Sequence, residues 1–181
     1  MRLLGTPVVY RWNARFLACA LFALSGKAHA FNEGLGQAAN LDRSSPYATV
    51  QGFLSEAGEG HFALAAQDLW LDNLPPGTQA AEGARLARRL HFVLDRQKLD
   101  LAALPKEGEG GPSSVVLATL ELDGRPTPVR LVRVRAPEGP IWVFSRDTVR
   151  AVDGLYEAYG PPFGESMPDF LFTTDSLVKV G

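Results

Sequence analysis

The sequence predicts a secreted domain of the α+β class, with helices first and a small antiparallel sheet after them. Residues 44–98 repeat apolar side chains at helical spacing behind serine and proline start signals. From residue 115 to 144 the apolar positions alternate around an Asp-Gly turn instead, and residues 149–159 return to helical spacing. We therefore expect an N-terminal helical hairpin and a long helix, packed with a three-stranded antiparallel meander and a C-terminal helix.

Residues 1–30 have the composition of a secretory signal peptide. Three arginines fall within the first 15 residues, an apolar run spans 16–24, and Ala28-His29-Ala30 fits a cleavage site. The run is too short to span a membrane, which takes about 20 residues. We expect cleavage before Phe31; an uncleaved anchor is the alternative.

Charge and cysteine content narrow the class of protein. Loss of residues 1–30 removes four of the 18 basic side chains and none of the 20 acidic ones, which changes the formal charge from −2 to −6. That balance gives no electrostatic reason to expect a nucleic-acid partner. The single cysteine, Cys19, lies in the leader. A mature chain without disulfides fits a bacterial periplasmic domain with an adequate core.

The helical half follows an irregular lead-in, residues 31–43. Ser45 and Pro46 open a first helix, which Gly58 to Gly60 end, and a second helix is expected from His61 to about Leu71. The longest helix is expected from Thr78 to near Lys98. Residues 99–104 fit either a short strand or a turn, and the Gly-, Glu- and Pro-rich residues 105–114 predict an exposed loop.

The strands are expected to form a meander. Alternation from Val115 to Leu122, the type I′ signal Asp123-Gly124 and a return from Thr127 to Ala136 predict a hairpin. Apolar residues occur on both parities of the return strand, which indicates either a bulge between Leu131 and Val132 or burial of both faces.

Residues 140–160 form the stretch around which we expect the fold to be organised. Ile141 to Phe144 are apolar on both parities, which favours a central strand covered on two faces. Ser145 is placed to cap the helix that follows, and Gly160 ends that helix. Residues 166–172 suggest a last apolar turn packed on this stretch, and 173–181 a tail. The domain is thus expected over residues 44–172.

The search for a catalytic or metal site finds none with the right pattern. His61 and His91 have no His or Cys neighbour at ligand spacing, so neither a metal nor a cofactor is expected. No G-x-S-x-G is present, and the carboxylates along 95–109 are interpreted as a solvated surface rather than a glycosidase pair. The alternating Arg130, Arg133 and Arg135 fit an exposed edge, or else an anion-binding strand.

Several segments together resemble a known family. They are Ser45-Pro46 with Phe53-Leu54, the run Gly60-x-Phe62-x-x-Ala65-Ala66-x-x-Leu69, Ala84 to Asp95 with its spaced leucines, and Pro140 to Ser145 with Thr148-Val149 and Leu155-Tyr156. In order and spacing, residues 44–172 resemble the periplasmic domain that precedes the membrane helices in small-conductance mechanosensitive channel (MscS-like) proteins. The chain differs in ending at Gly181, near where the first of those helices would start, and no pore residue is present to compare.

The resemblance implies a non-enzymatic, extracytoplasmic domain in the periplasm, associated with the inner membrane where it is continuous with a channel. Its expected partner is the membrane part of the same or a related channel, through which it would form homo-oligomers, with a role in modulating gating. No small-molecule substrate is identified. Structural or partner contacts are expected from Trp70, Trp142, Phe144, Ser145 and Tyr156.

Two other classes stay open. A free-standing periplasmic protein could bind a ligand or an envelope partner through Trp70, Trp142 and the arginine strand, which a concave apolar pocket with convergent polar groups would favour. An enzyme acting on envelope polymers would bring two carboxylates, or a serine and a histidine, together in a cleft.

Overall fold

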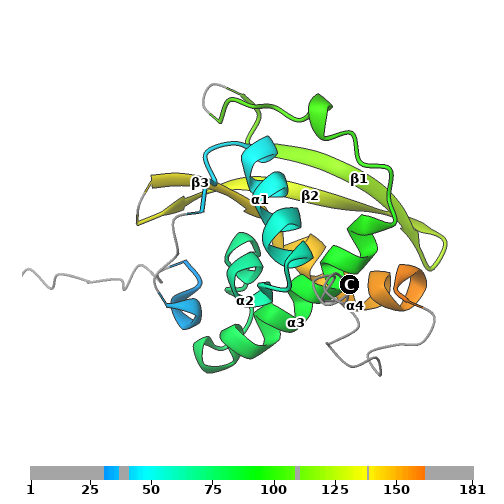
Figure 1. Ribbon diagram of the computed structural model, residues 1–181, viewed down its shortest axis with the longest axis horizontal. Helices are drawn as coiled ribbons and strands as arrows, with labels where there is room; N and C mark the ends of the chain where they lie inside the picture. The colour runs from blue at the N-terminus through cyan, green and yellow to red at the C-terminus, as the bar shows by residue number, and fades with distance from the viewer. Residues whose placement is uncertain (1–30, 37–40, 109–110, 138, 162–181) are drawn as a thin grey trace, which may run out of the picture.

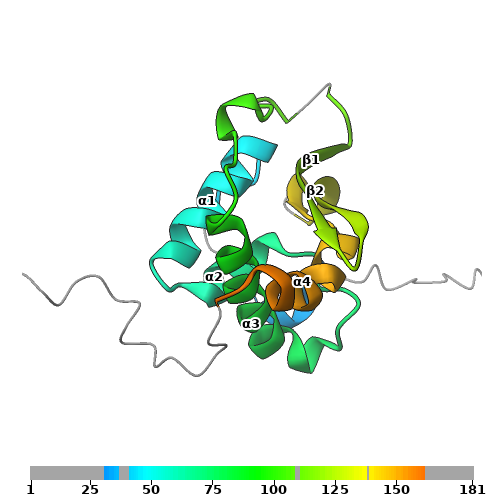
Figure 2. The same ribbon diagram turned by 90° about the vertical axis from the view of Figure 1, so that its right-hand side faces the viewer.

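The computed structural model describes residues 31–36, 41–108, 111–137 and 139–161. It has two layers: helices gathered on one face of a three-stranded antiparallel sheet in the order β1-β2-β3 (Figures 1 and 2). The predicted α+β class and its meander are therefore confirmed. The expected leader, the last apolar turn and the tail lie outside the described residues.

The elements have the following bounds. The helices are α1 (Pro46–Gly58), α2 (Phe62–Ala65), α3 (Pro76–Asp95) and α4 (Arg146–Tyr159), with short 3-10 helices at Glu33–Leu35, Ala66–Asp68 and Leu101–Ala103. The strands are β1 (Ser114–Leu122), β2 (Arg125–Ala136) and β3 (Gly139–Phe144). Within the described residues, no helix is long and apolar enough to cross a membrane.

The predicted start and turn signals work as expected. The Ser45 hydroxyl accepts a hydrogen bond from the Ala48 amide at 3.1 Å, and the Ser145 hydroxyl accepts one from the Thr148 amide at 3.2 Å. Asp123 and Gly124 both have positive φ, 51° and 71°, as a type I′ turn requires. These contacts are local, which is why the sequence shows them.

One hydrophobic core joins the helices to the sheet. Each of the four α-helices contributes buried apolar side chains to it, and the sheet contributes residues of its helix-covered face. Phe53 of α1 and Phe144 of β3 meet edge to face, with ring centroids 4.9 Å apart. A second, smaller cluster, the outer cluster, lies on the other face of the sheet and contains Ala136, Ile141 and Val143, covered by Phe31 and Trp70 among others. The apolar residues of β2 on both parities thus reflect burial of both faces.

Of the two alternatives for β2, the structure shows burial of both faces and no bulge between Leu131 and Val132. The pairing of β1 with β2 shifts register between Val116 and Ala118, in β1, while Leu131 and Val132 pair regularly with β3. Burial of both faces already explains Leu131 and Val132, so β2 needs no irregularity at that point.

Strand β3 is an edge strand and not the central strand that its apolar sequence suggested. Its free edge is covered by segments far away in the sequence. The Trp142 amide donates to the Arg43 carbonyl at 2.9 Å, and the Phe144 carbonyl accepts from the Trp70 amide at 3.1 Å. An edge satisfied in this way is as well buried as a central strand. A period-two pattern reports burial alone, so it could not distinguish the two positions.

The second helix is shorter than predicted. Regular α-helix ends at Ala65, a 3-10 turn follows, and Leu69 forms a parallel bridge with Phe144. The chain leaves the helix because pairing with the edge of β3 requires extended backbone at Leu69, whose φ and ψ are −97° and 142°. Helix α3 starts two residues earlier than expected, at Pro76, and ends at Asp95.

Two segments expected to be irregular pack tightly. In the lead-in, Asn32 is 2 % exposed and its side-chain amide donates to the Leu69 carbonyl at 2.7 Å. Residues 99–104 contain a 3-10 turn rather than a strand, and the chain then runs back to the start of α1, where the Tyr47 amide donates to the Pro105 carbonyl at 3.2 Å (Figure 1). Pro105 and Gly108 therefore contact the packed structure, whereas Lys106, Glu107 and residues 111–113 are exposed, as expected for this loop.

Candidate functional site

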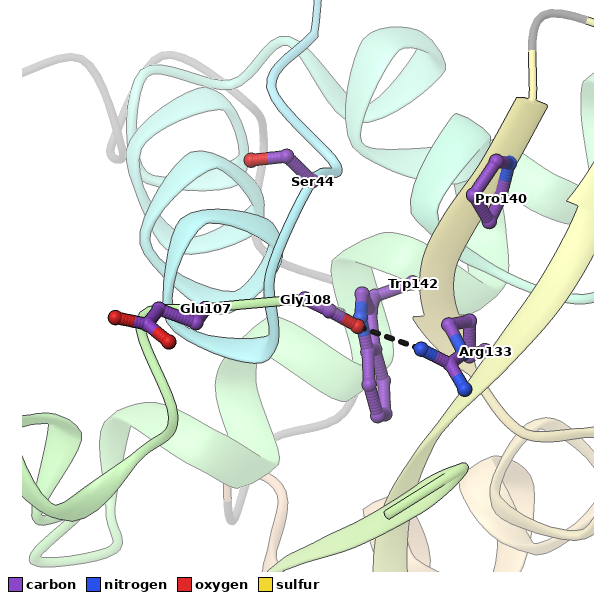
Figure 3. Close-up of a pocket in the computed structure, with 6 residues that line it drawn as sticks. All are labelled: Ser44, Glu107, Gly108, Arg133, Pro140 and Trp142. Carbon is purple, nitrogen blue, oxygen red and sulfur yellow. Dashed lines mark hydrogen bonds between the residues drawn. The ribbon is translucent and has the colours of Figure 1, made fainter. Parts of the chain in front are cut away.

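A cavity lies where the lead-in, the loop after α3 and the strands β2 and β3 meet. Its volume is about 570 Å³. It is lined by Ser44, Glu107, Gly108, Arg133, Pro140 and Trp142 (Figure 3). The volume falls in the range of about 300–1,000 Å³ that is usual for small-molecule sites.

The sheet register places the two largest side chains of the cavity together. Arg133 of β2 pairs with Trp142 of β3, so both side chains project from the helix-covered face. At the free edge of β3, the main chain of Trp142 is held by Arg43 and by the Thr49 hydroxyl, which donates to the Trp142 carbonyl at 3.3 Å. The wall formed by β2 and β3 is consequently rigid.

The loop wall depends on Gly108. Arg133 donates from Nη1 to the Gly108 carbonyl at 2.8 Å, which holds the loop against the sheet. A Cβ atom at residue 108 would lie 1.7 Å from the Ser44 carbonyl oxygen, so only glycine allows the two main chains to approach this closely. The same Cβ would lie 3.3 Å from the indole nitrogen of Trp142.

Two of the residues that line this cavity, Arg133 and Trp142, carry hydrogen-bond donors. Trp142 is 2 % exposed and its indole Nε1 has no acceptor among the described residues. Figure 3 shows the indole nitrogen and the Arg133 guanidinium both turned towards Gly108, whereas the carboxylate of Glu107 points away from them. A buried donor without a partner costs about 1–3 kcal/mol. An acceptor would therefore be bound favourably here if a small shift of the loop at Gly108, which lies against this nitrogen, let it reach the indole N–H.

Four of the five residues expected to make structural or partner contacts lie on the helix side of the sheet. Trp142 and Phe144 belong to the main core, Ser145 caps α4, and Tyr156 lies on α4 beneath Arg89, whose guanidinium carbon is 5.0 Å from the ring centroid. Of these, only Trp142 lines the cavity.

Trp70 lies on the opposite face. It packs on Phe31 in the outer cluster, and the Arg146 guanidinium stacks on it at 4.1 Å from the ring centroid. The expectation that Trp70 and Trp142 line one site is therefore wrong. Their backbones are close because residue 70 pairs along the edge of β3, but the sheet separates the two indole rings.

The arginine strand is divided in the same way. Arg130 pairs with Val116 and projects to the outer face, whereas Arg133 and Arg135 project to the helix side. Strand β2 is central in the sheet, so these residues do not form an exposed edge. Only Arg133 reaches the cavity.

One carboxyl group is buried away from this cavity. Asp68 is 1 % exposed, and its Oδ1 has no hydrogen-bond partner among the described residues. Burial raises the pKa of Asp68 to about 8, against the opposing effect of Arg43, while Glu56 raises it further. Asp68 therefore carries a proton at neutral pH more often than an exposed aspartate does.

Neither of the two histidines in the described residues lines the cavity. His61, at the start of α2, lies 3.0 Å from Glu56, and His91 on α3 is half-buried, with its pKa lowered by that burial. Across the described ranges, no group of three or more His, Cys, Asp or Glu side chains could hold a metal ion.

Sequence reasoning missed four residues of this cavity, which are Ser44, Glu107, Gly108 and Pro140. It named Trp142, and Arg133 only as one of three arginines on the same strand. The loop around Gly108 has the composition of a solvated segment, and nothing in its pattern shows that it folds back on β2. The one signal in the sequence was the alternation of arginines on β2. That alternation does not indicate which of the three arginines lines a cavity.

Neither the family models, nor the curated proteins, nor the solved structures compared with this chain gave a match. The fold and the cavity define an α+β domain with a cavity, lined in part by Arg133 and Trp142, beside the edge of its sheet.

Proposed function

We propose that this chain is a non-enzymatic extracytoplasmic domain of a protein of the MscS-like mechanosensitive channel family. Its place is the periplasm, beside the inner membrane, and its partner is the membrane part of the same or a related channel. The proposal rests on the order and spacing of residues that resemble that family. Most of the apolar residues among them are buried in the main core, Ile141 and Val143 lie in the outer cluster, and Ser45 and Ser145 cap helices.

The observation that best supports a mechanical role is the anchoring of the end of α4. The Tyr159 hydroxyl donates to the Glu121 carbonyl of β1 at 2.8 Å and accepts from the Glu121 amide at 3.1 Å. Arg96, at the end of α3, donates to the carbonyls of Tyr159 and Gly160. In the family that the chain resembles, the membrane helices follow this segment. A displacement there would be passed to both layers, and the domain could bias gating through contacts that differ between closed and open states.

The test is made on the full-length channel. The coding sequence is read beyond the Gly181 codon, and an open frame with several apolar spans of about 20 residues supplies the channel. Deletion of residues 31–172 from that protein should change the tension at which single channels open in membrane patches. A frame without such spans, or an unchanged threshold in the deletion variant, would contradict the proposal.

A ligand-binding module is the second candidate, and the cavity at Trp142 favours it. An apolar wall with buried, convergent donors is the usual form of a small-molecule site. This role is compatible with the first, because a bound ligand would change the contacts of the domain. It predicts saturable binding of a small molecule that perturbs Trp142, measured by the indole resonances in a nitrogen-15 NMR spectrum.

A further inference from the structure

We infer that the cavity between Gly108, Arg133 and Trp142 binds a small organic carboxylate with a flat or apolar body. This inference rests on the second candidate function and specifies its ligand. Its basis is the combination of a covered apolar wall, a guanidinium and an unsatisfied indole N–H within one cavity.

The donors select an anion. Arg133 uses Nη1 for the Gly108 carbonyl, and no contact to another described residue engages Nε or Nη2. These two groups form the planar fork that matches a carboxylate. The indole Nε1 of Trp142 is a further donor, and a tryptophan side chain cannot accept a hydrogen bond. A neutral amide accepts hydrogen bonds only through its carbonyl oxygen. Its N–H group would therefore face one of these donors without forming a hydrogen bond.

The walls select the body of the ligand. The exposed ring of Pro140 and the small accessible part of the Trp142 indole, which is 2 % exposed, are apolar and belong to the same strand, β3, whose main chain is fixed along its edge. A flat apolar group can pack on them with little loss of its own freedom. Inorganic anions and acetate lack such a group, so they should bind more weakly than an aromatic carboxylate.

The charges around the cavity also favour a carboxylate ligand. Arg133 is the positive side chain in its lining, and Glu107 is the negative one. The carboxylate of Glu107 is exposed and turned away from Arg133 and Trp142 (Figure 3). It would therefore be screened by solvent, whereas the interaction of a ligand with Arg133 would take place against a buried wall.

The experiment is a titration of the full, nitrogen-15-labelled chain with benzoate, benzamide, acetate and inorganic phosphate. The Trp142 indole resonance is assigned with Trp142→Phe. Benzoate should shift this resonance in a saturable way and bind at least about tenfold more tightly than benzamide, since a hydrogen bond to a charged group contributes about 1.5–3 kcal/mol. Acetate and phosphate should bind more weakly than benzoate.

Arg133→Gln and Arg135→Gln are the matched variants. Both remove one positive charge from the same face of β2, but Arg135 is exposed and does not line the cavity. Arg133→Gln should weaken benzoate binding at least about tenfold, and Arg135→Gln less than about twofold. Equal losses in the two variants would show a general effect of charge and overturn the inference.

The comparison of ligands in the unaltered chain does not depend on any variant. Equal affinity for benzoate and benzamide would overturn the carboxylate specificity while leaving a binding module intact. An affinity for phosphate equal to that for benzoate would overturn the inference that an apolar body contributes to binding. No saturable shift of the Trp142 resonance at millimolar concentrations would overturn both this inference and the ligand-binding candidate, but not the channel proposal.

Discussion

Asp68 is the residue whose environment differs most from that of a free side chain. Its carboxyl is buried, and one of its oxygens has no partner in the described part of the chain. The folded pKa, about 8, exceeds the value of about 4 in an unfolded chain. Between these two values the folded protein retains a proton that the unfolded chain has lost. The free energy of unfolding should therefore be highest below about pH 4 and should fall as pH rises towards 8, as far as this group determines it.

Asp68→Asn should remove this pH dependence. Asparagine has nearly the same shape and stays neutral, so the variant should gain about 2–4 kcal/mol in the free energy of unfolding at pH 8 and little at pH 4. Urea unfolding across this pH range measures the effect. Glu157→Gln, which changes an exposed carboxyl on α4, is the control. A gain in the Asp68 variant that does not vary with pH would contradict the prediction.

Gly108 is the second residue with a specific requirement. Gly108→Ala should lower the free energy of unfolding by about 1–3 kcal/mol, because the new methyl group would displace the loop from the Ser44 carbonyl. Gly111→Ala is the matched control, since a Cβ there would meet nothing within 4 Å. Thermal unfolding compares the two variants. Equal stability would mean that the loop is not held against Ser44 in solution.

At the level of elements, Ser145 and Thr148 join β2 to the start of α4. The Ser145 amide donates to the Arg130 carbonyl at 2.8 Å, and the Thr148 hydroxyl accepts from the Arg130 amide at 2.9 Å. The cap of α4 thus also continues the hydrogen bonding of the sheet. A helix positioned in this way has its direction fixed at its first turn.

Ser145→Ala should therefore cost more than the loss of a cap on an isolated helix. We expect a decrease of about 1–2 kcal/mol in the free energy of unfolding, since the buried Thr148 amide and hydroxyl both lose a partner. Ser55→Ala, at an exposed position of α1, should change it by less than about 0.5 kcal/mol. Denaturant unfolding distinguishes the two; equal effects would show that the cap contributes nothing beyond a surface serine.

For the whole molecule, the lead-in is joined to the segment that lies along the edge of β3. The Asn32 side chain donates to the Leu69 carbonyl at 2.7 Å and accepts from the Leu71 amide at 2.9 Å. Residues 69–71 in turn follow the edge of β3. One asparagine thereby holds the N-terminal segment against the segment that closes the sheet.

Asn32→Ala should destabilise the fold by about 2 kcal/mol, because it leaves two buried main-chain groups unpaired and places alanine at a φ of 51°. Hydrogen exchange should become faster at the Leu71 and Trp70 amides before it does in α3. Asn73→Ala, in an exposed turn, is the control. Unchanged exchange at residue 71 would contradict this connection.

The sequence by itself determined the local features of this protein. Serine and proline at helix starts, the Asp-Gly turn and the apolar periods act between residues that are close along the chain, and their physics does not need the rest of the fold. The α+β class followed from them, as did Ser145 and the buried side chains of Trp142 and Phe144.

Only the tertiary structure decided which strand lies at the edge, which face each tryptophan occupies and where the cavity forms. The period of β3 reports that both of its faces are covered. It does not report that the free edge is satisfied by Arg43, Thr49 and Trp70, which are more than 70 residues from their partners in the sequence. Gly108 becomes a wall of the cavity because Arg133 binds its carbonyl oxygen. Contacts of this kind form between segments that are far apart in the sequence, and no local pattern of residues predicts them.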